Sequence, residues 1–204
     1  MAGGSDEELV SAAARGDREA FGALVERHHR AIIRFVSRFL GIADPNTAED
    51  LAQDVFLRAW LAAPSFRPRP TARVSSWLLR IATNVGLNHL RHRRLRLALP
   101  IDEGTEPWAP EGYPGQTDGL VLAGETVRQV REAISNLAPM QRAAIVLREF
   151  HGLPYAEIAE VIETSVPAVE SLLVRARRAL GEALAGLETQ AQPQVFEGLG
   201  VESS

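Results

Sequence analysis

The chain has 204 residues, 46% of them hydrophobic, which is enough for one large or two small domains with buried cores. It has no cysteine, which excludes disulfides and thiolate metal sites. It also has no apolar run of about 18 residues and an acidic rather than signal-like N-terminus, so we expect a cytoplasmic protein without membrane insertion.

The net charge of −4 hides an uneven distribution along the chain. All 22 basic residues are arginine, and nine of them fall in residues 55–101, which contain no acid. This segment therefore carries +9, and the remaining thirteen arginines and 26 acids give −13. A basic segment in an acidic protein indicates a localised site for a polyanion, and a solvated basic surface is the alternative.

The N-terminal third predicts three helices. Ser5 and Glu8 have the spacing of a capping box before a short helix over residues 9–15, and Asp17 caps a long helix that extends to about Leu40. After a break over residues 41–46, we expect Thr47 to cap a third helix, AEDLAQDVFLRAW.

This third helix has two faces of different character. Leu51, Val55 and Ala59 face one way at helical spacing. The opposite face is mixed acidic and apolar, with Asp50, Gln53, Asp54 and Leu57. Such a face is either an ordinary solvated surface or a docking surface for a partner protein.

A basic, proline-containing loop and an arginine-rich helix follow. Residues 64–74 contain three prolines and cannot form a helix. We expect the pair Ser75-Ser76 to cap a helix over residues 77–96. One face of that helix can stack unpaired bases, bond their edges and hold phosphates, although a core tryptophan beside polar surface residues is the alternative. Its residues are Trp77, Arg80, Asn84, Asn88 and Arg91.

Residues 97–124 have a different composition, with four prolines, five glycines, five acids and no base. This composition predicts a mobile acidic linker that divides the chain into two domains. The second domain is expected to contain helices over residues 125–137 and 140–150, the latter ended by Gly152.

Residues 155–180 read as two short helices separated by a tight turn, with a cap signal at Thr164-Ser165 and Pro167 near the start of the second helix. This pattern is typical of a helix-turn-helix, whose second helix enters the DNA major groove, and a packed helix pair is the alternative. The outward residues of the second helix can meet base edges and phosphates. They are Glu170, Ser171, Val174, Arg175 and Arg178.

Four motifs together resemble a known family: AEDLAQDVFLRAW, SSWLLRIATNVGLNHLR, LAPMQRAAIVLREFHGLPYAEIAEVI and AVESLLVRARRAL. In this order, with an acidic linker of this length, they resemble the extracytoplasmic-function (group 4) sigma factors of bacterial RNA polymerase. The resemblance covers roughly residues 8–96 and 125–185. It implies an all-α fold with two helical domains joined by a flexible acidic linker. The parts would be sigma region 2 (5–96), the linker (97–124), the region 4 helix-turn-helix domain (125–187) and a C-terminal tail (188–204).

The resemblance implies a non-enzymatic initiation factor without cofactor or metal. It would bind core RNA polymerase on the clamp helices of the β′ subunit, the −35 element as duplex and the −10 element as a single strand. It would then promote melting at a specific regulon, set by stress or an envelope signal, and an anti-sigma factor would be a usual partner.

Site residues are carried over where the motifs match. Core polymerase would contact Asp50, Leu51, Gln53, Asp54, Phe56 and Leu57. The −10 strand would contact Arg73, Ser76, Trp77, Arg80, Asn84, Asn88 and Arg91. The −35 duplex would contact Ser165, Glu170, Ser171, Arg175 and Arg178.

Three residues depart from the family pattern. Glu163 stands where this turn usually carries glycine, and Glu170 and Leu172 stand where many relatives have basic residues. Since a glutamate accepts from cytosine N4 but repels phosphate, an unusual or weaker −35 preference is expected.

Two other functional classes are weighed. A stand-alone operator-binding regulator would explain the helix-turn-helix but neither the docking helix nor the Trp77 face. An enzyme lacks support because no Gly-rich phosphate loop, HExxH or cysteine motif is present. His89 and His92 are three residues apart and could share a metal, but solvated or phosphate-side roles are the expectation.

Overall fold

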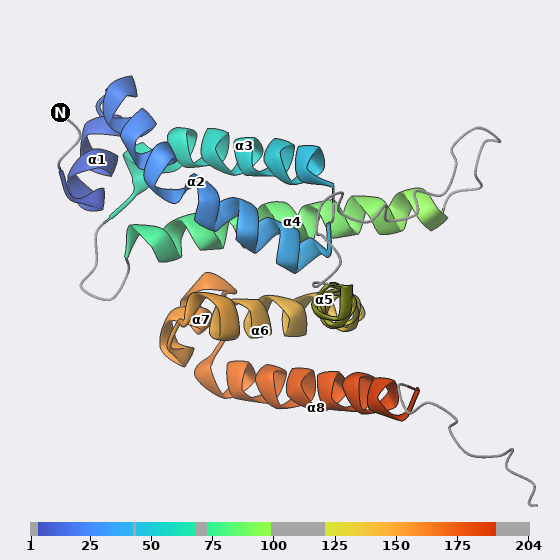
Figure 1. The fold of residues 1–204 in the computed structure, drawn as a ribbon. Helices are drawn as coiled ribbons and strands as arrows, with labels where there is room; N and C mark the ends of the chain where they lie inside the picture. The colour runs from blue at the N-terminus through green and yellow to red at the C-terminus, as the bar shows by residue number, and fades with distance from the viewer. Residues whose placement is uncertain (1–3, 43, 68–72, 99–120, 191–204) are drawn as a thin grey trace, which may run out of the picture.

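The computed structural model describes residues 4–42, 44–67, 73–98 and 121–190, and every regular element in these ranges is a helix (Figure 1). In chain order they are α1 (Asp6–Ala13), α2 (Arg18–Leu40), α3 (Pro45–Ala62), the 3-10 turn η1 (Ala63–Ser65), α4 (Val74–Ala98), α5 (Val121–Ser135), α6 (Pro139–His151), α7 (Tyr155–Val161) and α8 (Val166–Gln190). The prediction of an all-α chain with two helical domains is confirmed.

The first two helices begin at the predicted caps. The Ser5 hydroxyl accepts from the Glu8 N–H at 3.2 Å, and the Glu8 carboxylate accepts from the Ser5 N–H at 2.9 Å. The Asp17 carboxylate accepts from the backbone N–H groups of Glu19 and Ala20, both at 3.0 Å. These bonds satisfy donors that have no partner within the helix.

Two helix starts differ from the prediction. Asp44, not Thr47, caps α3: its carboxylate accepts from the N–H groups of Asn46 and Thr47, and Pro45 occupies the first helical position. Proline fits there because its missing N–H would have no helical partner. Helix α4 begins at Val74 rather than after Ser75-Ser76, which buries the Val74 side chain in the core.

The helices also extend into both ends of the segment predicted as a linker. Helix α4 continues to Ala98 and α5 starts at Val121, where the apolar sequence VLA permits a helix. The rest of the predicted linker, residues 99–120, lies outside the described residues, as does the tail beyond Gln190.

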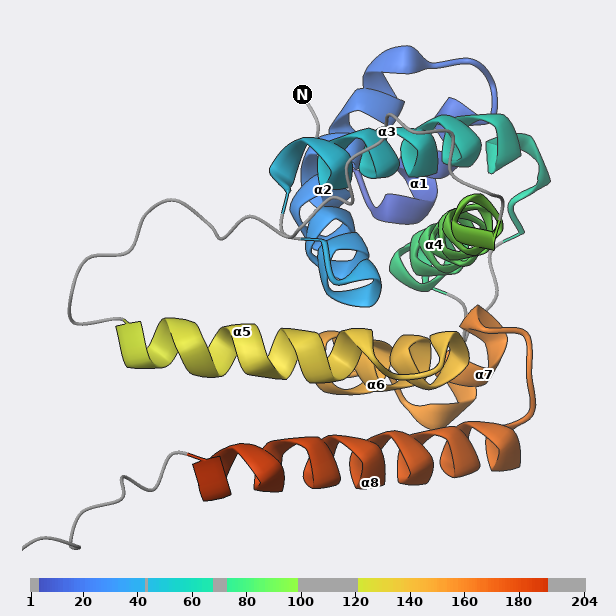
Figure 2. The same ribbon diagram turned by 90° about the vertical axis from the view of Figure 1, so that its right-hand side faces the viewer.

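The two domains form two layers that pack on each other. Helices α1 to α4 make one bundle, and α5 to α8 lie beneath it, with α8 packed on α5, α6 and α7 (Figures 1 and 2). Between the layers, α2 contacts α5 and α6, and α4 contacts α7. One continuous cluster of buried apolar side chains runs through both layers.

Within the first layer, α2 and α4 approach closely at Gly86. A Cβ atom at this position would lie 2.5 Å from Cε1 of the fully buried Phe39 ring. The absence of a side chain at Gly86 therefore lets the Phe39 ring, which stacks on Phe35 at 5.5 Å between centroids, lie against α4.

A buried arginine joins the two layers. Arg142 on α6, 7% exposed, donates to the backbone carbonyls of Phe39 (3.1 Å) and Leu137 (3.1 Å), and also to that of Ser135. These carbonyls belong to or follow the last turns of α2 and α5, where they have no helical partner and the helix dipole favours a cation. Nothing in the local sequence pattern identified this role.

Candidate nucleic-acid interface

The predicted docking face lies on the outer side of α3. Asp50, Gln53 and Leu57 are exposed, and Leu57 leaves 59% of its surface accessible. Asp54 is partly exposed and pairs with Arg58 at 3.0 Å.

Two residues of the predicted docking set lie on the inner side of α3. Phe56 is only 5% exposed, and its ring stacks on His29 with 6.2 Å between centroids. Leu51 packs partly buried against the core. The family motif alone does not separate the residues that present this surface from those that hold the helix in place. Leu61, 70% exposed one turn after Leu57, extends the apolar surface beyond the predicted set.

The predicted −10 residues follow one side of α4. Arg80, Asn84 and Arg91 are exposed, Trp77 and Asn88 are partly buried, and Arg73 is exposed just before the helix. Ser76, 7% exposed, is the exception.

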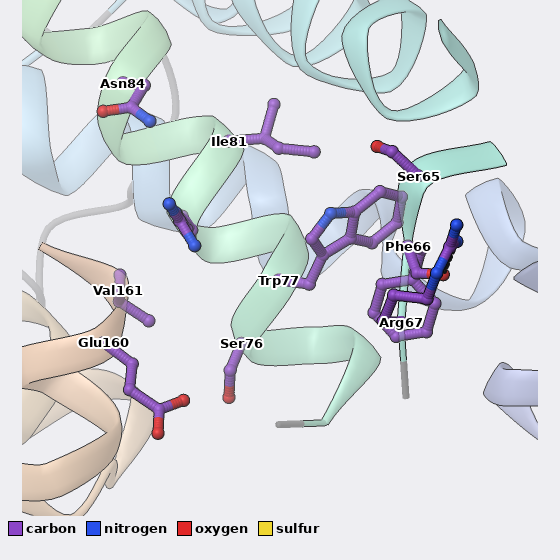
Figure 3. A pocket seen from close by; sticks show the side chains of 10 residues that line it. Ser65, Phe66, Arg67, Ser76, Trp77, Ile81, Asn84, Glu160 and Val161 are labelled. Carbon is purple, nitrogen blue, oxygen red and sulfur yellow. Dashed lines mark hydrogen bonds between the residues drawn. The ribbon is translucent and has the colours of Figure 1, made fainter. Parts of the chain in front are cut away.

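Trp77 forms one wall of a pocket of about 400 Å³ between α4, the segment after η1, and α7 (Figure 3). Its indole packs against the Phe66 ring, with 4.9 Å between centroids and 53° between planes. The lining residues are Ser65, Phe66, Arg67, Ser76, Trp77, Arg80, Ile81, Asn84, Glu160 and Val161. An aromatic wall with amide and guanidinium groups can stack a base and bond its edge. Phe66 and Arg67 were missed by the sequence analysis, although both lie in the predicted basic loop.

The helix-turn-helix is formed by α7, a turn at Glu163 and α8. Glu163 adopts φ 53°, the left-handed region that favours glycine, and the Thr164 N–H donates to the Ala159 carbonyl at 2.9 Å. The Ser165 hydroxyl accepts from the Ala168 N–H at 3.4 Å at the start of α8. The turn is therefore formed in spite of the glutamate.

The predicted −35 residues all lie on the outer face of α8 or at its start. Ser165, Glu170, Ser171, Arg175 and Arg178 are exposed. The inner face is anchored by Val169, Leu173 and Ala176, each 0% exposed. The Arg178 guanidinium is engaged by Glu182 at 2.8 Å, which raises its pKa.

Burial and neighbouring charges lower the pKa values of two basic groups, His151 and Arg142, where the two layers meet. Burial, together with Arg38 and Arg34, lowers the pKa of His151 to about 4, so its ring is neutral near pH 7. That ring makes an edge contact with Phe35 at 5.6 Å between centroids. Burial is also the main cause of the lowered pKa of Arg142, which is nevertheless cationic at any ordinary pH.

Within the described ranges, no group of three or more potential metal ligands is present, and no helix is long and apolar enough to cross a membrane. A helical bundle with an aromatic pocket on a basic helix, packed on a helix-turn-helix, defines a two-domain helical DNA-binding protein.

The comparisons with known proteins identify the family. Residues 24–96 match Sigma-70 region 2, and residues 127–180 match Sigma-70 region 4. The chain belongs to the extracytoplasmic-function sigma factors, which direct bacterial RNA polymerase to promoters and are not enzymes.

Relatives match over most of their length. The chain is 34% identical over 194 residues to RNA polymerase sigma-H factor of Pseudomonas aeruginosa, covering 91% of this chain and 97% of the relative. It is 36% identical over 180 residues to ECF RNA polymerase sigma factor SigC of Mycobacterium tuberculosis, covering 86% and 91%.

Two solved structures share the fold. CnrH in complex with the cytosolic domain of CnrY gives a TM-score of 0.63 at 29% identity, covering 89% of this chain and 97% of that one. The sigma factor RpoE in complex with the anti-sigma factor NepR from Bartonella quintana gives 0.62 at 25% identity, covering 81% and 96%.

Proposed function

We propose that this sigma factor recognises its promoters through two separate surfaces and promotes their melting. The outer face of α8 reads the −35 element as duplex, and the α4 face holds the −10 element as a single strand. The observation that carries this proposal is the pair of rings Trp77 and Phe66 beside Arg80 and Asn84, because it places aromatic and polar groups together on the first domain, next to an arginine-rich helix.

These side chains of the first domain give promoter melting a physical basis. A base that leaves the duplex loses its stacking and pairing, and it regains both only where an aromatic ring and hydrogen-bond partners meet. Trp77 and Phe66 supply the rings, and Asn84 and Arg80 supply an amide and a guanidinium. The arginines of residues 55–101 add phosphate contacts that weaken with salt.

Open-complex formation with core polymerase tests the −10 assignment. On a promoter found by run-off transcription, Asn84→Ala should reduce permanganate-reactive thymines by about tenfold, since one lost polar contact to a base is worth on the order of 1–3 kcal/mol. Asn136→Ala, an exposed amide at the end of α5, is the matched control and should leave melting unchanged. Equal melting by both variants would remove Asn84 from the −10 site.

The −35 assignment rests on exposed residues of α8, where Glu170 replaces a charge that favours phosphate. A glutamate at a base edge selects cytosine through its N4 donor. Glu170→Arg should therefore shift the preferred −35 sequence from cytosine toward guanine at one position, as read from a randomised −35 library. An unchanged preference would place Glu170 away from the bases.

For docking on core polymerase, we propose Asp50, Gln53, Asp54 and Leu57 together with the added Leu61. A salt-tolerant apolar contact flanked by carboxylates fits a partner helix with apolar and basic residues. Leu57→Asp should weaken binding to core enzyme by at least tenfold, whereas Leu95→Asp, at a similarly exposed leucine of α4, should not. Similar losses in both variants would contradict the assignment.

We also propose cytoplasmic action and control by an anti-sigma factor. Two structurally similar chains were solved in complexes with the CnrY cytosolic domain and with NepR, respectively. The genes transcribed with this factor would form a regulon induced by stress or by an envelope signal. Co-purification of the tagged chain from its own cells, followed by mass spectrometry, should recover such an inhibitor together with core polymerase.

A further inference from the structure

The α4 face proposed for the −10 strand is in contact with the second domain. The Ser76 hydroxyl donates to the Glu157 carboxylate of α7 at 2.7 Å. The Arg80 guanidinium donates to the Glu163 carboxylate at 2.9 Å from Nε and at 2.5 Å from Nη2. Glu160 stands at the wall of the same pocket, with its carboxylate directed toward α4 (Figure 3). Carboxylate oxygens thus occupy the donors that a phosphate or base would use.

The backbone conformation at Glu163 is one that disfavours a glutamate. At φ 53° a glycine would be free of the steric cost that a glutamate incurs. The turn itself gains nothing from the side chain, whose hydrogen-bond partner is Arg80 in the other domain, 83 residues away. The glutamate therefore serves the contact between the domains.

Further contacts hold the same arrangement. Arg142 bonds to the Phe39 carbonyl across the seam, and the Arg38 guanidinium lies over the Phe150 ring at 4.5 Å from its centroid. The outer face of α8, in contrast, is exposed. In this arrangement the −35 surface faces away from the first domain, whereas Ser76 and Arg80 of the −10 surface are engaged by carboxylates of the second domain.

We propose that Glu157 and Glu163 are a built-in competitor of the −10 strand. In the free chain these two carboxylates add to the contacts that hold the domains together and occupy donors of the −10 face. Those donors become available when the second domain moves away, as when core polymerase holds the two domains apart. This inference rests on the proposed −10 function of α4. On this proposal, a glutamate occupies a turn position that favours glycine because its side chain inhibits the −10 face of the same chain.

The size of the effect follows from the contacts. An exposed ion pair and a hydrogen bond to a charged acceptor together shift an equilibrium by about tenfold when both are removed. Glu157→Gln/Glu163→Gln should therefore raise the ratio of open to closed chain by about tenfold. Glu19→Gln/Glu132→Gln removes the same charge from two exposed positions outside the proposed DNA-binding surfaces and is the matched control.

The first measurement is the distance between the two domains in the absence of DNA. Because the chain lacks cysteine, Glu7→Cys and Ala183→Cys, both at exposed positions, place two spin labels uniquely in the full chain. We expect a narrow distance distribution in the parent and in the control, and a broader, longer one in Glu157→Gln/Glu163→Gln. Identical distributions in all three would overturn the proposal, whatever the −10 residues do.

The second readout is binding of a fluorescein-labelled random-sequence 14-nucleotide single strand to the full chain at low salt. Glu157→Gln/Glu163→Gln should bind about tenfold tighter than the control double variant, and adding Asn84→Ala should reverse much of this gain. Opening without tighter binding than the control would overturn the competition. Opening with tighter binding that Asn84→Ala leaves untouched would support competition for the strand while contradicting the proposed −10 site.

Discussion

Arg142 offers a test of how the two domains are held together. Among the described residues its buried guanidinium has no carboxylate partner, and it donates instead to carbonyls at the ends of α2 and α5. We consider Arg142→Met, which keeps the length of the side chain but removes the donors.

Two effects oppose each other in this substitution. Methionine relieves the burial of a charge, a gain that in some proteins cancels the lost interactions. However, it leaves the buried carbonyls of Phe39 and Leu137 without a donor, each at a cost of about 1–3 kcal/mol. The second effect should win, and we expect a net loss of about 2–4 kcal/mol, because methionine can satisfy neither carbonyl.

Thermal unfolding followed by circular dichroism measures this loss. For a chain of this size it corresponds to a decrease in Tm on the order of 10 °C. Arg177→Met is the matched control, because Arg177 is half exposed and pairs with Glu149 of its own domain, so it should cost under about 1 kcal/mol. A Tm for Arg142→Met equal to that of the parent would refute the reasoning, since burial of the charge would then cost as much as the hydrogen bonds contribute.

Three further predictions concern single sites. Phe56→Ala should lower the free energy of unfolding by about 3–5 kcal/mol, and Leu57→Ala should change it by less than about 0.5 kcal/mol, in urea titrations; equal effects would contradict their burial. Gly86→Ala should destabilise by about 1 kcal/mol, because overpacking against Phe39 exceeds the helix-propensity gain, whereas Gly22→Ala, at an open helical position, should stabilise by about 1 kcal/mol. The third prediction concerns pH. Above pH 6.5 the His151 ring is neutral in the folded and in the unfolded chain. Between pH 6.5 and about pH 4 the ring binds a proton in the unfolded chain but stays neutral in the folded chain. Stability should therefore fall by about 1–2 kcal/mol between pH 7 and pH 5, after allowance for partial solvent contact, and His151→Phe should abolish this part of the pH dependence.

Local signals in the sequence predicted the helices well where one residue decides the boundary. The capping groups Ser5 and Asp17 and the left-handed Gly152 act within a few residues, and each does what its position predicts. At α3 the expected cap was Thr47, whereas the helix is capped by Asp44, three residues earlier, because Pro45 fits only the first turn. At α4, burial of Val74 outweighs the serine cap signal.

The contacts between the domains were not predictable in the same way. Arg142 and its partner carbonyl at Phe39 are 103 residues apart, and the carbonyl belongs to the backbone, which leaves no trace in side-chain patterns. Glu163 was noticed as an unusual turn residue, but its partner Arg80 depends on how two independently patterned domains pack. Periodicity places a residue on a face of its helix and does not say which other helix covers that face.

Run-off transcription with bacterial core polymerase tests the central claim most directly. The templates would be fragments of the genome that encodes this chain, transcribed with and without the protein. The account predicts discrete transcripts that require the protein and that decrease with Asn84→Ala but not with Asn136→Ala. A folded protein that neither associates with core enzyme nor yields any transcript would contradict it.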